Sequence, residues 1–179
     1  MSKEELLDIL DETGELTGLL ENRKLVHEKG MWHRSVHVWF FDENKLLLQR
    51  RTDTKESFPG MYDASVAGHV EAGESCLDAA VRETLEELGI AILPEKLIWL
   101  GCQRLVIIHK ERNFISREYN YIYLYRSDFK TISVDYDTDE ISDVIWCDVK
   151  ELEKELICNN KMYCVQKIEI ALLNQYLNE

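Results

Sequence analysis

The chain has 179 residues, 45% of them hydrophobic, and its 34 acidic residues against 21 basic ones give a formal net charge of −13. This composition predicts a folded chain and argues against long disordered stretches. The excess of negative charge disfavours a protein that wraps a nucleic acid polymer. A small anionic substrate stays compatible with this charge if a divalent cation stands between it and the protein. From the length, we expect residues 1–179 to form a single domain.

The five cysteines are odd in number and nowhere spaced as Cys-x-x-Cys, so the sequence predicts neither a disulfide framework nor a zinc ribbon. Reduced thiols are typical of a cytoplasmic protein. The start of the chain carries acidic residues where a signal peptide needs a basic end. No segment approaches the roughly 20 apolar residues that span a bilayer. We therefore expect a cytoplasmic protein with no membrane partner, and the sequence leaves its oligomeric state open.

Short runs of β-branched and aromatic residues between turn residues dominate the pattern. Strands interleaved with helical segments predict an α/β fold with a mixed sheet, on which an N-terminal hairpin and a C-terminal helix pack. In chain order we predict the hairpin over about 6–20, one or two helical turns over 23–29, strands over 35–41, 46–49, 62–67, 98–108, 114–125 and 144–147, and helices over 76–88, 149–156 and about 163–177.

The predicted helix over 76–88 has clear ends, because Ser75 is a good N-cap and Gly89 is the expected stop. Its carboxylates Glu83, Glu86 and Glu87 are three and four residues apart, so they project together from adjacent turns. Like charges at this spacing repel, and a hard divalent cation such as magnesium or manganese would offset the repulsion. The apolar residues expected to pack inward are Leu77, Ala80, Val81, Leu85 and Leu88.

A solvated helix face is the ordinary explanation of such carboxylates, and for these three alone we would favour it. The fixed spacing around them outweighs it: Gly68, Glu74, Arg82-Glu83, Glu86-Glu87 and Gly89-Ile90. This arrangement resembles the Nudix box, the signature of the Nudix hydrolases. One position departs from the pattern, since Thr84 stands where an aliphatic residue is usual.

The resemblance implies a Nudix fold, an α/β/α sandwich whose box forms a loop–helix–loop that binds magnesium or manganese. It implies a pyrophosphohydrolase, an enzyme acting on acid anhydrides, in which water attacks phosphorus. The implied metal ligands are Glu83, Glu86, Glu87 and the carbonyl of Gly68; the implied catalytic residues are Arg82, Glu83 and Glu86; Glu74 would organise the site with Arg82. We expect Glu83 to be the general base, with Glu118 or Glu140 as alternatives from outside the box.

Outside the box the chain resembles isopentenyl diphosphate isomerases and their hydrolase-like relatives. The segments that carry this likeness are WHRSVHVWFF (32–41), LLLQRRTDTK (46–55), FPGMYDASVAGHV (58–70) and DEISDVIWCDV (139–149). Where the isomerases have a catalytic cysteine this chain has Ala67, which cannot exchange a proton. The isomerases also have a degraded box, so the intact box here favours hydrolysis.

This second likeness implies further site residues. His27, His33 and His69 match positions that bind metal, although packing or surface roles are common for histidine. Arg51 and Lys55 match positions that hold diphosphate, against the alternative of a solvated loop. Glu118 matches an acidic strand residue and is a further substrate-binding candidate.

We therefore expect metal-dependent hydrolysis of a diphosphate linkage in a nucleoside diphosphate derivative or a similar organic diphosphate. Two alternatives stay open: an isomerase-like activity with its acid–base chemistry moved to Tyr119 or Glu118, and a non-catalytic sensor of a phosphorylated ligand. The sequence does not define the group attached to the diphosphate.

Overall fold

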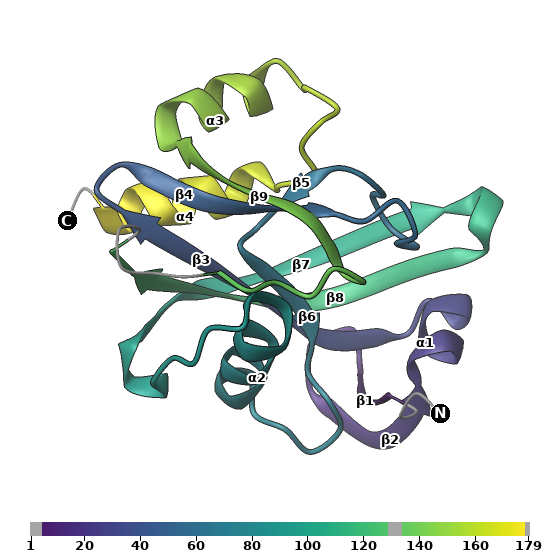
Figure 1. Cartoon of the computed structure of the whole chain (residues 1–179). Helices are drawn as coiled ribbons and strands as arrows, with labels where there is room; N and C mark the ends of the chain where they lie inside the picture. Colours follow the sequence, from purple (N-terminus) through teal and green to yellow (C-terminus); the bar gives the residue numbers. More distant parts are fainter. Residues whose placement is uncertain (1–4, 129–133, 178–179) are drawn as a thin grey trace.

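The computed structural model describes residues 5–128 and 134–177, so the ends of the expected single-domain range, 1–4 and 178–179, lie outside it. Its helices are interspersed among runs of strands (Figure 1). In chain order they are β1 (Leu6–Leu10), β2 (Leu16–Asn22), α1 (Arg23–Lys29), β3 (Trp32–Asp42), β4 (Lys45–Arg51), β5 (Tyr62–Asp63), β6 (Val66–His69), α2 (Cys76–Leu88), the 3-10 turn η1 (Pro94–Lys96), β7 (Leu97–His109), the 3-10 turn η2 (Lys110–Arg112), β8 (Phe114–Arg126), β9 (Ile141–Asp148), α3 (Val149–Ile157) and α4 (Lys167–Leu177).

The strands form one mixed sheet centred on β3, which pairs in parallel with β8 and antiparallel with β4 and β6. Because side chains alternate along a strand, β3 supplies two cores. Val36 and Val38 face the core that contains α2, whereas Trp39 and Phe41 face the core that contains α3 and α4. Helices therefore cover both faces of the sheet (Figure 1), and the predicted α/β/α sandwich is confirmed.

The predicted hairpin is present as β1 and β2, which pair antiparallel. The predicted strand over 62–67 is instead divided into β5 and β6, because the two parts pair with different strands. At the break, the hydroxyl of Ser65 donates to the carbonyl of Leu47 at 2.6 Å and accepts from the amide of Phe40 at 2.8 Å. Ser65 thus ties β3 to β4 at the point where the chain changes partners.

The C-terminal helix begins at Lys167, four residues later than predicted. The preceding segment is held in an extended pairing, since Tyr62 donates to the carbonyl of Met162 and the amide of Cys164 donates to the carbonyl of Tyr62. On this helix Ile168 is 52% exposed, whereas Glu169 is buried. None of the helices in the described residues is both long and apolar enough to cross a membrane.

Both ends of α2 agree with the prediction: Ser75 accepts from the amide of Asp78, and Gly89 ends the helix in the left-handed region at φ 67°. The predicted inward face is partly wrong, because Leu77 and Leu85 are exposed. The face that meets the sheet is rotated toward Ala80, Thr84 and Glu87. The other buried residues of α2 are Ala79 and Leu88. A carboxylate therefore lies on the buried side of this helix.

Candidate active site

A cleft of about 630 Å³ opens beside α2, with walls from β3, β6, β8 and the loop that follows β4. The predicted metal ligands from α2 meet there with the other candidates, although they are distant in sequence. The predicted residues that line the cleft are Arg51, Lys55, Gly68, His69, Arg82, Glu83, Glu86, Glu87, Glu118 and Glu140. Glu74 lies behind this wall and contacts it through Arg82.

The three carboxylates of α2 differ in exposure. The side chain of Glu86 is 59% exposed and that of Glu83 only 14%, whereas Glu87 is buried. One oxygen of Glu87 accepts from the amide of Ala67 and from Nε2 of Gln49, both at 3.1 Å. These two donors fix the buried carboxylate against β4 and β6.

Gly68 lies directly against the Glu83 carboxylate. A Cβ built at Gly68 would stand 2.1 Å from Cδ of Glu83 and 2.4 Å and 2.5 Å from its oxygens. No side chain fits in that space. Glycine therefore lets the main chain of β6 approach the carboxylates closely enough for both to share one ligand.

Arg82 organises the acidic cluster. Its guanidinium makes a two-point pair with Glu74, with Nε and Nη2 donating at 3.0 and 2.8 Å. Nη1 donates to Glu83 and to Glu86, each at 2.9 Å, and Nη2 also donates to the carbonyl of His69 at 3.0 Å. The two-point contact of Arg82 is thus made with Glu74, whereas Glu86 receives a single hydrogen bond.

The electrostatics of the cluster favour a bound cation. Burial raises the pKa of the Glu83 carboxyl, against the opposing charge of Arg82. Burial and the charge of Glu83 raise the pKa of Glu87. A hard divalent cation would offset both effects, and carboxylate and carbonyl oxygens are the ligands that magnesium and manganese prefer. The carboxylates present here, with the main chain of Gly68 directly against Glu83, fit such an ion.

Two cationic side chains line the same cleft as the carboxylates of α2. Arg51 is held by the Ser57 carbonyl and hydroxyl at 3.0 and 3.1 Å and lies 3.4 Å from Asp63. Lys55 pairs with Glu140, which belongs to the segment just before β9. Both cations therefore reach the cleft in defined positions, and Glu140 is engaged by one of them.

Glu118 lies at the floor of the cleft, where β8 runs beside β3. It is buried and accepts from the hydroxyls of Ser35 and Ser116. Burial raises its pKa, but the neighbouring His33 and His69 and the two hydroxyls outweigh burial and lower the pKa to about 2. This carboxylate is thus a stable anion within the fold.

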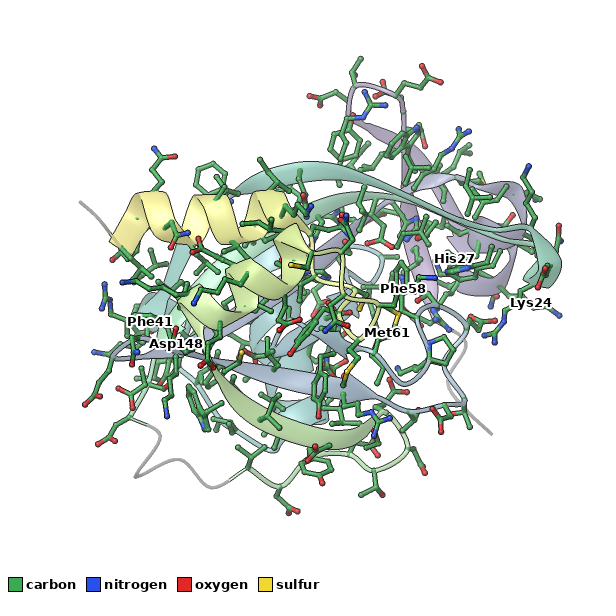
Figure 2. The ribbon with its side chains drawn as sticks, turned by 90° about the horizontal axis from the view of Figure 1, so that it is seen from above. Lys24, His27, Phe41, Phe58, Met61 and Asp148 are labelled. Carbon is green, nitrogen blue, oxygen red and sulfur yellow. The ribbon has the colours of Figure 1, made fainter. Side chains whose placement is uncertain are left out.

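The three predicted histidines come together beside this floor. His27, His33 and His69 each place a ring nitrogen within 4.8 Å of the others, but only His69 lines the main cleft, and His27 lines a smaller hollow of about 140 Å³. His27 lies at the α1 end of the molecule, opposite Phe41 and Asp148 (Figure 2).

The hydrogen bonds of these rings leave nitrogens free. Nδ1 of His33 is 3.0 Å from the Met31 carbonyl, and Nδ1 of His69 is 3.1 Å from Glu5. Both nitrogens of His27 and Nε2 of His33 are buried without a partner among the described residues. Burial, with the charge of the neighbouring rings, lowers the pKa of His27 to about 3 and that of His33 to about 4. Neutral rings with free nitrogens are the form that binds metal.

Sequence reasoning missed two residues of this region, Gln49 and His37. Gln49 holds the buried Glu87, and His37 lines the cleft from β3. The alternation of β3 places His37 on the same side as His33, so this signal was available in the sequence. For Gln49 the only signal is a polar residue in an otherwise apolar strand.

The model of the NUDIX domain family matches residues 31–166, which include α2, most of the cleft and most of the sheet. The chain belongs to the Nudix hydrolase family. It is 40% identical over 161 residues to an uncharacterized Nudix hydrolase of Clostridium acetobutylicum, covering 86% of this chain and 75% of that one. It is 43% identical over 125 residues to Nudix hydrolase 3 of Arabidopsis thaliana, covering 68% of this chain but only 16% of that protein.

Solved structures show the same Nudix fold. A Deinococcus radiodurans protein superposes with a TM-score of 0.67 at 23% identity, over 95% of this chain and 98% of that one. The MutT protein of Methanosarcina mazei superposes with a TM-score of 0.62 at 16% identity, over 82% of this chain and 94% of that one. At these identities the likeness concerns the fold alone. The likeness to the isomerase branch therefore stays a hypothesis from the sequence.

Proposed function

We propose that this Nudix protein is a pyrophosphohydrolase that cleaves a diphosphate linkage in a nucleoside diphosphate derivative or a similar organic diphosphate. The observation that carries the proposal is the cluster of Glu83, Glu86 and Glu87, with Glu83 against the main chain of Gly68, in one cleft with Arg51 and Lys55. Acidic and basic walls of this kind suit a diphosphate and a divalent cation together. A cytoplasmic location is part of the proposal, and the five free cysteines are consistent with it.

We assign the metal ligands to the three glutamates and the Gly68 carbonyl, with magnesium or manganese as the ion. When bound, such an ion supplies charge neutralisation at the diphosphate and a more acidic water. Arg51 and Lys55 then bind the remaining phosphate oxygens, and Arg82 with Glu74 keeps Glu83 and Glu86 aligned.

The proposed general base is Glu83. Oε1 of Glu83 accepts from Arg82, so we assign Oε2 to take the proton of the attacking water. The two alternatives are weaker, because Glu118 has a pKa lowered to about 2 and Glu140 is paired with Lys55.

The deciding experiment measures phosphate release from nucleoside di- and triphosphates, dinucleotides, sugar nucleotides and prenyl diphosphates, with magnesium or manganese. Wild type is compared with Glu86→Gln, whose exposed position should leave the fold intact, and with Glu95→Gln as an exposed control outside the cleft. Turnover that disappears only in Glu86→Gln supports the proposal. If the wild type releases phosphate from no member of the panel, the proposal is contradicted. Deuterium exchange into isopentenyl diphosphate would then favour the isomerase alternative.

We further propose that His27, His33 and His69 bind a second metal ion, supported by their mutual approach within 4.8 Å and the buried nitrogens that lack a partner. Three neutral imidazoles suit a transition-metal ion such as zinc. Cobalt(II) should give a visible absorption band in wild type and in Glu86→Gln, and His27→Gln should abolish it. An identical band in His27→Gln would contradict this site.

A further inference from the structure

A buried polar network joins the C-terminal helix to the central strand. Glu169 of α4 is only 1% exposed. Its carboxylate lies 3.0 and 3.1 Å from Nδ1 of His37, 3.0 Å from Nε1 of Trp39 and 2.8 Å from Nε2 of Gln103. An ionised carboxylate only accepts hydrogen bonds, so all three groups donate to it. The charge is thus fully partnered inside the protein.

His37 stands between this network and the cleft. In the antiparallel pairing of β3 with β6 it lies opposite Ala67, the residue before Gly68. Directly opposite residues share one face of a sheet, and both residues line the cleft. Because Nδ1 is engaged by Glu169, Nε2 is the polar atom of the His37 ring that is left for a ligand.

Stabilisation of the fold does not by itself explain the buried network around Glu169. A buried charge has a desolvation cost, and well-packed apolar residues often stabilise a core as well or better. In α4 the buried position is occupied by Glu169, while the neighbouring Ile168 is 52% exposed. The fold therefore accommodates a carboxylate where an aliphatic residue was available next to it. A functional role of His37, the histidine that Glu169 contacts, accounts for this arrangement.

We propose that His37 donates a hydrogen bond from Nε2 to a non-bridging oxygen of the bound diphosphate, and that Glu169 is a positioning residue that fixes the His37 ring. The inference rests on the proposed function, because it takes a diphosphate as the occupant of the cleft. His37 lines the same cleft as Gly68, Arg51 and Lys55, so all of these groups reach one ligand.

The charges around the ring keep Nε2 a donor. Glu169 contacts it from α4, and Glu118 of β8 and Asp63 of β5 are the other carboxylates that act on it. Burial lowers the pKa of His37, but these carboxylates outweigh burial and raise the pKa to about 9. An imidazolium donates from both nitrogens, so one bond serves Glu169 and the other remains for the ligand.

The test uses methylenediphosphonate, a diphosphate mimic that is not hydrolysed, with magnesium, and measures its affinity by titration calorimetry. His37→Phe removes the donor, Glu169→Gln removes the charge that orients it, and Gln103→Met is the matched control, since it removes another donor to the same carboxylate. Loss of a charge-assisted hydrogen bond should weaken binding about 10- to 100-fold in His37→Phe. Glu169→Gln should weaken it in the same direction, and Gln103→Met should not.

Two further measurements separate this role from a structural one. In wild type, the ¹⁵N signal of Nε2 of His37 should move when methylenediphosphonate is added. Manganese affinity, measured by electron paramagnetic resonance, should be the same in wild type and His37→Phe.

Unchanged affinity in a folded His37→Phe, or a Nε2 signal that does not move, would overturn the inference. The same holds if Gln103→Met weakens binding as much as Glu169→Gln does. Normal turnover of a diphosphate by His37→Phe would contradict this inference while leaving the proposed function intact. A wild type that neither binds the mimic nor hydrolyses any member of the panel would contradict both.

Discussion

Replacing Gly68 with alanine tests whether the main chain of β6 and the Glu83 carboxylate share a ligand. The new Cβ would lie 2.1 Å from Cδ of Glu83, so the carboxylate must retreat by about 1.3 Å to reach the 3.4 Å of ordinary contact. Gly68 is outside the left-handed region, so alanine adds no backbone strain and the effect is steric. A displacement near 1 Å at a reacting centre costs on the order of 100-fold in rate.

The assay for Gly68→Ala is kcat/KM on the best substrate of the panel, together with manganese affinity by electron paramagnetic resonance. Glu95→Gln is the control, since Glu95 is exposed and lies outside the cleft. A second variant, Gly68→Ala with Glu83→Asp, shortens the side chain and should recover part of the manganese affinity. Wild-type kcat/KM and manganese affinity in Gly68→Ala would refute the shared-ligand geometry.

Three further predictions concern other contacts. The pKa of His37 is about 9 in the folded protein, against 6.5 for an unperturbed histidine. This difference corresponds to about 3 kcal/mol of stabilisation of the folded state. The stabilisation is complete below pH 6.5 and is lost as the pH rises through 9. Urea unfolding should therefore show that Glu169→Gln lowers the free energy of unfolding most near pH 6 and less near pH 10. An equal decrease at both pH values would contradict the ion pair between His37 and Glu169. Arg82→Lys keeps the charge but loses the two-point contact with Glu74, so kcat/KM should fall by about 100-fold, and near-normal turnover would be contrary evidence. Thr84→Val removes a buried hydroxyl and keeps the shape, so the free energy of unfolding should change by less than about 1 kcal/mol with unchanged turnover; a larger loss would assign the hydroxyl a structural role.

The resemblance of the box identified the acidic cluster in advance, but helix periodicity misplaced the buried face of α2. Periodicity ranks side chains by hydropathy, so it chose Leu77 and Leu85, which are exposed, and passed over Glu87, which is buried. Glu87 is buried because Gln49 and the amide of Ala67, both distant in sequence, supply its hydrogen bonds. A polar residue can replace an apolar one in a core only when such partners exist.

The sequence by itself determined what depends on neighbours along the chain. Helix caps such as Ser75 and Gly89 and the order of strands and helices follow from local chemistry, and the box followed from fixed spacing. The tertiary structure alone decided what depends on pairing between distant segments. The Ser65 break between β5 and β6 and the contact of Glu169 with His37 require strands and a helix that meet only in the folded chain. The physical reason is that burial and hydrogen-bond partners belong to the assembled core, whereas propensity and spacing belong to the chain.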